Sequence, residues 1–262
     1  MLQIQNISKT FNADTINEKK ALINVSLTLN DGDFCTVIGG NGAGKSTLMN
    51  AVSGVWPVDS GRILLDGEDI SGLPEFKRAP YLGRVFQDPM TGTAGDMQIV
   101  ENMALAARRG EKRGLRWGFS KKDAKEYRDL LKKLDLGLED RMTSKVGLLS
   151  GGQRQALTLL MATLKRPKLL LLDEHTAALD PKTAKKVLDA TDRIVEEGHL
   201  TTLMVTHNMH DAITHGNRLI MMSGGQIIYD VSGEEKKSLQ VSDLLRKFEE
   251  AGGEVSDRMA LS

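Results

Sequence analysis

The sequence predicts an α/β fold with a mostly parallel sheet, and two observations lead to this prediction. Short, continuous apolar runs recur along the chain, which is typical of strands buried on both faces of a parallel sheet. Helical patterns separate these runs, and alternating strands and helices favour an α/β architecture. We expect buried strands at Phe34 to Ile38, Gly83 to Phe86, Leu169 to Leu172 and Leu200 to Val205, and helices at Lys45 to Val52, Gln153 to Leu164 and Thr183 to Glu197.

The length and composition are those of a globular chain. With 262 residues, 40% of them hydrophobic, the chain has enough apolar side chains for a sizeable core. Lys plus Arg and Asp plus Glu both total 35, so no net charge favours nucleic acid, and we expect no such partner. The single Cys35 is expected to be a small buried hydrophobe, which fits a reducing cytoplasm. No signal peptide or apolar run of roughly 18 residues is visible, so we expect another chain to span any membrane that this one serves.

Three other segments complete the expected organisation. Alternating apolar residues at Gln3 to Ile7 and Ile23 to Leu29 predict a small antiparallel sheet. A helical pattern between Asp88 and Leu149 predicts a helical subdomain inserted into the sheet domain, and a Ser-Gly-Gly-Gln turn within 218–230 predicts a hairpin. We expect one domain over 1–262, with its core at 1–88 and 164–235, the helical subdomain at 89–163 and a C-terminal tail at 236–262.

A phosphate-binding loop follows the first buried strand. The residues Gly39-Gly40-Asn41-Gly42-Ala43-Gly44-Lys45-Ser46 match G-x-x-x-x-G-K-[ST] between an expected strand and an expected helix. Glycines let backbone N–H groups and the helix N-terminus point at phosphate oxygens, while Lys45 reaches the β and γ phosphates of ATP. Ser46 is expected to hold Mg²⁺, and the neighbouring Thr47 is expected to contact the nucleotide. The alternative, a glycine-rich turn that only permits tight packing, does not need a Lys-Ser pair at the helix entrance.

Two carboxylates follow the apolar strand Leu169 to Leu172. Ligands gather at the C-terminal ends of strands in open parallel sheets, and there Asp173 is placed to bind Mg²⁺ through water. Glu174 points elsewhere at the end of a β period, so it is a candidate to polarise a water beside the γ-phosphate. The alternative is a strand that simply ends in a solvated loop.

The run Leu149-Ser150-Gly151-Gly152-Gln153, followed by a helix, makes the assignment more specific. With it, the sequence resembles the ABC ATPase family over nearly the whole chain. The motifs stand in family order: the phosphate loop, Gln87, the signature at Ser150, Asp173-Glu174, Asp180 and His207. Ser223-Gly224-Gly225-Gln226 repeats the core of the signature, but no helix follows it, so we interpret it as a hairpin turn.

The resemblance implies a fold, a mechanism and roles for single residues. It implies a P-loop NTPase (RecA-like) parallel-sheet core with an N-terminal antiparallel β subdomain and an inserted α-helical subdomain that carries the signature. It also implies a head-to-tail homodimer around two Mg²⁺-ATP, in which Ser150, Gly151, Gly152 and Gln153 bind the γ-phosphate of the nucleotide held by the other subunit. Further roles follow by position: Gln87 at Mg²⁺ and the attacking water, His207 at the γ-phosphate, Asp180 in communication across the dimer, and Phe11 stacked on adenine.

Each of these single residues also has a plain structural interpretation. Gln87 can cap a strand end, His207 and Phe11 can be core residues, and Asp180 can be the N-cap of the helix that Pro181 starts. One departure from the family pattern is visible, because the family usually has Pro after the catalytic Glu and this chain has His175. We expect catalysis to survive and the local loop to be less rigid.

Three functions compete: the energising subunit of a transporter, a soluble non-transport ABC ATPase, and a nucleotide sensor that binds without hydrolysis. A soluble ABC ATPase normally needs two cassettes or long coiled-coil arms, and a sensor should have lost Glu174 or His207, so transport is favoured. We then expect a peripheral position on the cytoplasmic face of the cell membrane, an integral membrane permease and an extracellular solute-binding protein as partners. The runs 173–181 and 239–245 resemble ATPases of bacterial aromatic amino-acid uptake systems.

A basic stretch within 108–128 is interpreted as a solvated helix edge, with contact to anionic lipid or an acidic permease loop as the alternative. Its members are Arg108, Arg109, Lys112, Arg113, Arg116, Lys121, Lys122 and Lys125, interleaved with Trp117 and Phe119.

Overall fold

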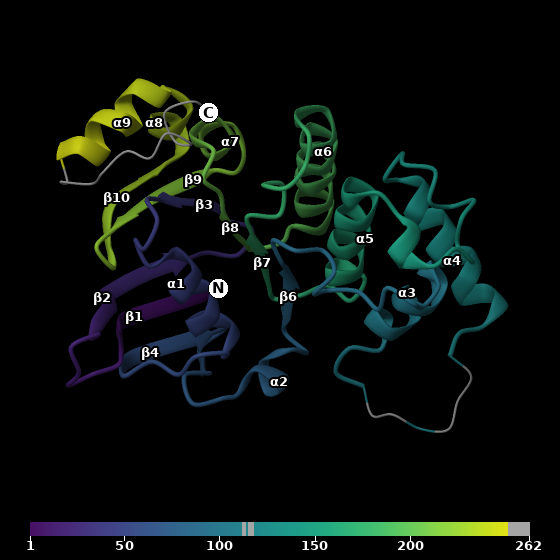
Figure 1. Ribbon diagram of the computed structural model, residues 1–262, viewed down its shortest axis with the longest axis horizontal. Coiled ribbons are helices and arrows are strands. Elements are labelled where there is room, and N and C mark those ends of the chain that lie inside the picture. Colours follow the sequence, from purple (N-terminus) through teal and green to yellow (C-terminus); the bar gives the residue numbers. More distant parts are fainter. Residues whose placement is uncertain (112–113, 115–117, 251–262) are drawn as a thin grey trace.

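The main sheet has six strands in the order β10-β9-β3-β8-β7-β6 (Figure 1). The computed structural model describes residues 1–111, 114 and 118–250. Strands β9, β3, β8, β7 and β6 run parallel, and β10 joins β9 as an antiparallel hairpin. The predicted parallel α/β sheet and the C-terminal hairpin are confirmed. The bounds are β3 Phe34–Gly39, β6 Leu82–Val85, β7 Leu169–Asp173, β8 Thr202–Val205, β9 Arg218–Ser223 and β10 Gln226–Ser232.

A second, antiparallel sheet has the order β2-β1-β4-β5. Strands β1 and β2 were predicted from the start of the chain, whereas β4 and β5 were not. Register shifts interrupt the pairing of β1 with β2, beginning after Ile4. Inward-facing residues of this sheet, such as Leu2 and Ile63, pack with Leu48 of the first helix and Val37 of the main sheet. The first helix therefore lies between the two sheets. The bounds are β1 Leu2–Phe11, β2 Lys19–Leu29, β4 Ser60–Leu65, β5 Glu68–Asp69 and α1 Lys45–Ser53.

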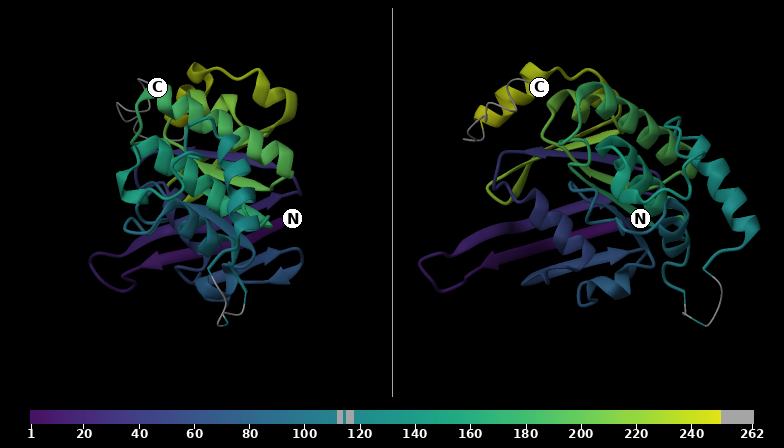
Figure 2. Two further views of the ribbon diagram at one scale, coloured as in Figure 1. Left: turned by 90° about the vertical axis from the view of Figure 1, so that its right-hand side faces the viewer. Right: turned by 45° about the vertical axis from the view of Figure 1, so that its right-hand side comes forward.

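Apart from α2, whose Arg78 bonds to the end of α1, the remaining helices cover the other face of the main sheet and its edge beyond β6. Figure 1 shows α3, α4 and α5 grouped on the side away from the antiparallel sheet, and the right-hand view of Figure 2 keeps α4 and the β1–β2 hairpin at opposite ends. No helix in the described part of the chain is long and apolar enough to cross a membrane. The bounds are α2 Glu75–Arg78, α3 Ile99–Ala107, α4 Lys121–Lys132, the 3₁₀ turn Val146–Leu148, α5 Gly151–Thr163, α6 Pro181–Gly198, α7 Met209–Thr214, α8 Gly233–Lys237 and α9 Val241–Glu250.

Strand β7 shows why its sequence is uniformly apolar. Leu169 and Leu171 pack in the cluster that contains α1, whereas Leu170 and Leu172 pack in the cluster that contains α5. Successive side chains of a strand point to opposite faces, so both faces of β7 are core. The same alternation places α1 and α5 on opposite sides of the main sheet.

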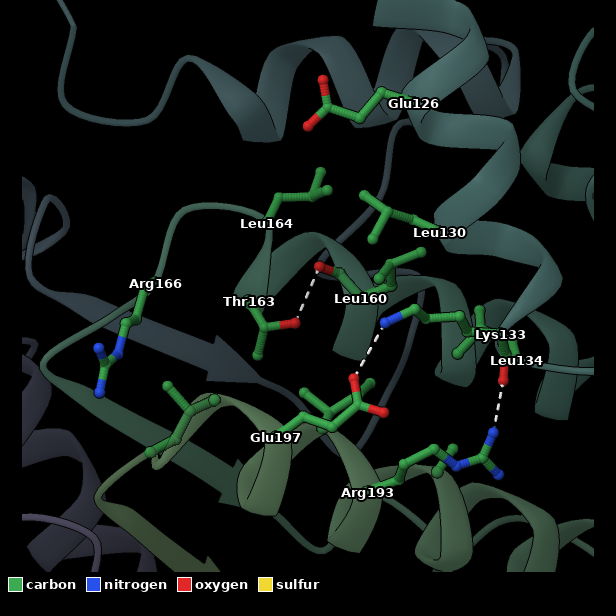
Figure 3. Close-up of a pocket in the computed structure, with 14 residues that line it drawn as sticks. Glu126, Leu130, Lys133, Leu134, Leu160, Thr163, Leu164, Arg166, Arg193 and Glu197 are labelled. Carbon is green, nitrogen blue, oxygen red and sulfur yellow. Dashed lines mark hydrogen bonds and ion pairs between the residues drawn. The ribbon is translucent and has the colours of Figure 1, made fainter.

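A cavity of about 330 Å³ marks where α4, α5 and α6 meet (Figure 3). Apolar side chains such as Leu130 and Leu160 line it. Lys133 and Glu197 form an ion pair of 3.0 Å across its rim, from α4 to α6. A third cluster packs α9 on the sheet through Leu244 and Phe248, so residues 241–250 are a folded helix within the expected C-terminal tail.

Candidate functional site

The loop between β3 and α1 needs glycine at two positions for steric reasons. Gly39 has φ +153° and Gly44 has φ +103°. A Cβ at Gly39 would lie 2.3 Å from the Met222 carbonyl oxygen, and one at Gly44 would lie 2.5 Å from the Ala21 carbonyl oxygen. Gly44 is also the N-cap of α1, where no side chain caps the helix. The first-turn N–H groups of α1 are therefore left to a ligand, and the dipole of the helix favours an anion there.

Lys45 is buried in this loop although its ammonium carries a charge. The residue is 7% exposed, and its Nζ donates to the carbonyl oxygens of Gly39 at 2.6 Å and Gly40 at 3.1 Å. Burial lowers the pKa of Lys45, and the carboxylates of Glu174 and Asp173 oppose this shift. A buried cation thus stands between the phosphate loop and the two acids. Of the other predicted loop residues, Asn41, Gly42 and Ser46 are exposed, Ala43 and Thr47 are buried, and Gly40 is half-buried.

The two acids at the end of β7 have different surroundings. Asp173 Oδ2 lies 3.5 Å from Arg84, and burial raises the pKa of Asp173 while Arg84 opposes that shift. Glu174 has φ +43°, a left-handed conformation that is strained for a side chain of this kind. His207 Nδ1 lies 3.7 Å from Glu174 Oε2. The structure therefore brings Lys45, Asp173, Glu174 and His207 together at the C-terminal ends of neighbouring strands.

Arg84 is a residue of this site that sequence reasoning missed. Its guanidinium donates to Asn50 Oδ1 at 2.8 Å and to Ser53 Oγ at 2.9 Å, both on α1. It also stacks over the Phe86 ring at 4.6 Å. Arg84 thus joins α1, β6 and the acid on β7. A charged residue inside an expected buried strand is the signal that could have revealed it.

The signature residues form the start of α5. Ser150 Oγ accepts from the Gln153 N–H at 3.3 Å, and Gln153 Oε1 accepts from the Ser150 N–H at 3.2 Å, which makes a capping box. Gly152 packs on α6, where a Cβ would lie 1.9 Å from Thr183 Cγ2. Ser150 and Gly151 are exposed. The signature therefore opens a helix on the face of the main sheet opposite to the helix that the phosphate loop opens.

Gln87 and Asp180 lie beside the ends of β6 and α6. Gln87 is exposed after β6, and the segment before it is held by Gln155, whose buried Nε2 donates to the Phe86 carbonyl at 3.1 Å. Gln155, a polar residue on the buried face of α5, was not predicted from the sequence. Asp180 is the N-cap of α6, because its Oδ1 accepts from the Thr183 N–H at 3.1 Å.

Phe11 and His175 both have partners that the sequence did not reveal. Phe11 ends β1 half-buried, with its ring edge-to-face with Trp56 at 4.9 Å. His175 is 3% exposed, and its Nε2 lies 3.1 Å from Thr191 Oγ1 of α6. Burial lowers the pKa of His175 to about 4, so the ring is neutral near pH 7. This hydrogen bond joins the loop after Glu174 to α6, and the lower rigidity expected for a loop without Pro stays a prediction.

The basic stretch is not uniformly a solvated edge. Arg109 donates to the carbonyl oxygens of Ala162, in the last turn of α5, at 2.9 Å and of Lys165, just beyond its end, at 2.6 Å. Its guanidinium therefore stabilises a helix C-terminus. Lys121, Lys122 and Lys125 are exposed, as expected for a solvated face, whereas Lys112, Arg113, Arg116 and Trp117 lie outside the described residues.

The donor set suits Mg²⁺ better than a transition metal. Within 1–111, 114 and 118–250, no three His, Cys, Asp or Glu side chains gather as metal ligands. Mg²⁺ is usually held by one or two carboxylates together with phosphate oxygens and water. Asp173 and the exposed Ser46 hydroxyl fit that requirement beside a phosphate-binding loop.

Comparisons with known proteins agree with this geometry. The family described as "ABC transporter" matches residues 22–177. The chain is 46% identical to a tyrosine transport ATP-binding protein of Clostridioides difficile, over 96% of this chain and 100% of that relative. It is 34% identical to a phosphonates import ATP-binding protein of Lactococcus lactis subsp. cremoris, over 94% and 99% of the two chains. An ATP-binding cassette solved as a dimer in a post-hydrolysis state with ADP and Pi matches with a TM-score of 0.76 and 28% identity, over 88% of this chain and 98% of that one.

Proposed function

This chain belongs to the ABC transporter family. On that premise we propose which residues bind ATP, which hydrolyse it and which transmit the resulting conformational change to a permease. The chain is an ATP-binding and ATP-hydrolysing subunit of an import system. One observation carries the proposal for the site: Lys45, Asp173, Glu174 and His207 converge at the strand ends beside an uncapped helix N-terminus.

ATP binds with its phosphates against the loop 39–46. The N–H groups at the start of α1 bind the phosphate oxygens. Lys45 Nζ replaces its hydrogen bonds to the Gly39 and Gly40 carbonyls with bonds to the β and γ phosphates. Ser46, Asp173 and Gln87 would hold Mg²⁺, which would neutralise charge on the phosphate oxygens. Phe11 stacks on adenine with its ring braced by Trp56. Thr47, in the first turn of α1, contributes to nucleotide binding through its position beside Ser46.

Hydrolysis is assigned to Glu174 as general base. Its carboxylate accepts a proton from a water whose oxygen attacks the γ-phosphorus, the bond to the β–γ bridging oxygen breaks, and ADP and phosphate are released. His207, 3.7 Å from this carboxylate, orients it and donates to the γ-phosphate. Gln87 orients the water from the other side.

A second copy of the chain completes each site. Ser150, Gly151 and the N-terminus of α5 bind the γ-phosphate held by the other subunit, head to tail, while Gly152 and Gln153 hold that turn in shape. Asp180 caps α6 next to this contact and communicates between the two sites. Solved relatives that dimerise support this arrangement. One copy alone should hydrolyse ATP poorly, because each of its sites lacks the signature residues.

Closure of the dimer around ATP moves an integral membrane permease through residues 89–163. These residues act as a helical subdomain on the core 1–88 and 164–235, with 236–262 as the C-terminal tail. A groove between β6, α3 and α5 offers a docking surface, lined among others by Phe86, Leu105, Arg109, Thr158 and Met161. The chain then lies at the cytoplasmic face of the membrane, and a solute-binding protein serves the outer face. The tyrosine transport relative supports an aromatic amino acid as cargo.

The test compares purified wild type with Glu174→Gln in Mg²⁺-ATP, measuring ATP turnover and oligomeric state. We expect turnover by the wild type and loss of at least about 100-fold in the variant, which should accumulate as an ATP-bound dimer because closure precedes hydrolysis. Normal hydrolysis by the variant would remove Glu174 from the mechanism. If neither protein binds ATP, the assignment of the loop 39–46 as the ATP-binding site is contradicted as well.

A further inference from the structure

The backbone at Glu174 is held in a conformation that it does not favour. Its φ of +43° lies in the left-handed region, where a residue with a Cβ is strained. Such a conformation persists only where its surroundings fix it. Two backbone bonds contribute: the Glu174 N–H donates to the Val205 carbonyl at 2.9 Å, and the Ala177 N–H donates to the Glu174 carbonyl at 3.0 Å.

The next side chain supplies a third restraint, and its direction can be derived. Thr191 Oγ1 is fully buried and donates its single hydrogen to the Val187 carbonyl at 2.8 Å. Its oxygen must therefore accept from His175 Nε2 at 3.1 Å, so His175 carries its proton on Nε2. Both residues are buried, so water does not compete for the bond.

Helix α6 is a suitable anchor for this bond. It runs for 18 residues from Pro181 to Gly198, with Asp180 as its N-cap. Its first turn contacts Gly152 through Thr183, and its third turn holds the bond to His175 through Thr191. The same helix therefore contacts the start of the signature helix α5 and the residue next to the proposed base.

We propose that His175 is a positioning residue for ATP hydrolysis, which fixes the turn that presents Glu174 by donating a hydrogen bond to Thr191 on α6. The proposal rests on the proposed role of Glu174 as the base. His175 itself does not touch the nucleotide in this account. Its effect is on the placement of a carboxylate, and such placement changes the chemical step more than binding.

The experiment measures kcat, KM for ATP and thermal unfolding of the purified full-length chain with Mg²⁺-ATP. We expect His175→Ala and Thr191→Val each to lower kcat about tenfold or more, with KM for ATP within about twofold of wild type. His175→Gln, which keeps a donor near the position of Nε2, should recover most of the loss. The double variant should be no worse than the poorer single variant, because the bond is already broken in each.

Thr163→Val is the matched control. The Thr163 hydroxyl donates within α5 to the carbonyls of Leu159 at 3.0 Å and Leu160 at 3.1 Å (Figure 3), and the Leu159 bond has the same i to i−4 spacing as the Thr191 bond in α6. No histidine bonds to Thr163 in the described structure. It should keep the wild-type kcat. An equal loss in this control, or additive losses in the double variant, would overturn the proposal.

The proposal and the function that it rests on can fail separately. If His175→Ala and Thr191→Val both keep the wild-type kcat while Glu174→Gln is inactive, the positioning role of His175 is contradicted and Glu174 remains the base. Normal hydrolysis by Glu174→Gln would remove the proposed base itself. Where His175→Ala does not fold, Thr191→Val and His175→Gln still decide, because both nearly conserve volume.

Discussion

Two buried cationic side chains, Arg78 and Lys236, donate hydrogen bonds to backbone carbonyl oxygens at the ends of helices. The Arg78 guanidinium donates to the carbonyls of Ala51 and Val52 at 2.8 Å each, at the end of α1. Lys236 Nζ donates to the carbonyls of His215 and Gly216 just after α7. Neither residue was singled out from the sequence, because Arg and Lys are exposed in most proteins and their carbonyl partners lie far along the chain. Burial nevertheless has a measurable consequence for Lys236.

Lys236 should make stability rise at alkaline pH. Burial lowers the pKa of Lys236 from 10.5 to about 8, so between these pH values the unfolded chain binds a proton that the folded chain has lost. Stability gained from this group therefore rises with pH through that window, by roughly 1–3 kcal/mol. A neutral amine still has two hydrogens for its two carbonyls. The measurement is the free energy of unfolding of wild type minus Lys236→Met, at pH 7.5 and 9.5.

Lys237→Met provides the control for this pH effect. Lys237 is exposed and paired with Glu234 at 2.7 Å, so its removal should leave the pH dependence of unfolding unchanged. A difference between wild type and Lys236→Met that stays flat with pH would show that the buried ammonium is not destabilised in the fold.

Among the elements, the contact between α5 and α6 sets the position of the signature. Helix α5 begins at Gly151 because Ser150 and Gln153 cap it, and a sequence pattern is sufficient to predict that cap. The pattern does not show that Gly152 faces Thr183 of another helix. The helix after the signature run was thus predicted and confirmed, whereas its packing partner required the structure.

Gly152→Ala should destabilise the protein by roughly 1–3 kcal/mol, because its Cβ would lie 1.9 Å from Thr183 Cγ2. Adding Thr183→Ser removes that methyl group and should restore most of the stability. Gly151→Ala is the matched control, since its Cβ would meet only Leu179 Cδ2 at 3.4 Å, an ordinary contact. The readout is the free energy of unfolding in denaturant. Equal losses in the two alanine variants would mean that helix packing is not the cause.

For the molecule as a whole, the separation of α1 and α5 across the main sheet has a functional consequence. The phosphate loop opens α1 and the signature opens α5, and the two helices pack on opposite faces of β7. In a symmetric head-to-tail dimer, each nucleotide then meets the loop of one copy and the signature of the other. Such a site can be divided between two different variants.

Mixing Lys45→Ala with Ser150→Arg should restore activity that each lacks alone. Half of the random dimers are mixed, and each mixed dimer has one complete site, so recovery should approach roughly a quarter of the wild-type rate. The measurement is ATP turnover against mixing ratio. Mixing Lys45→Ala with Glu174→Gln is the control, because both changes affect the same half of a site and no complete site can form. An absence of recovery in the first mixture at every ratio would contradict the shared site.

The sequence by itself determined the features that depend on neighbours along the chain. Apolar runs predicted the strands of the parallel sheet, and the loop Gly39 to Ser46 predicted the phosphate-binding turn, since both are local patterns of residue type and spacing. The resemblance to ABC ATPases also rested on such local motifs, and the family match agrees with it.

Only the tertiary structure decided the contacts that join these motifs. Gln155 bonds to Phe86 across 69 residues, His175 bonds to Thr191 across 16, and Gly152 meets Thr183 on a neighbouring helix. Each of these contacts depends on how separate elements pack, so no spacing in the sequence signals it. Glu174, with its left-handed backbone conformation, lies beside His207 only in the folded protein, because the ends of β7 and β8 meet only when the sheet forms.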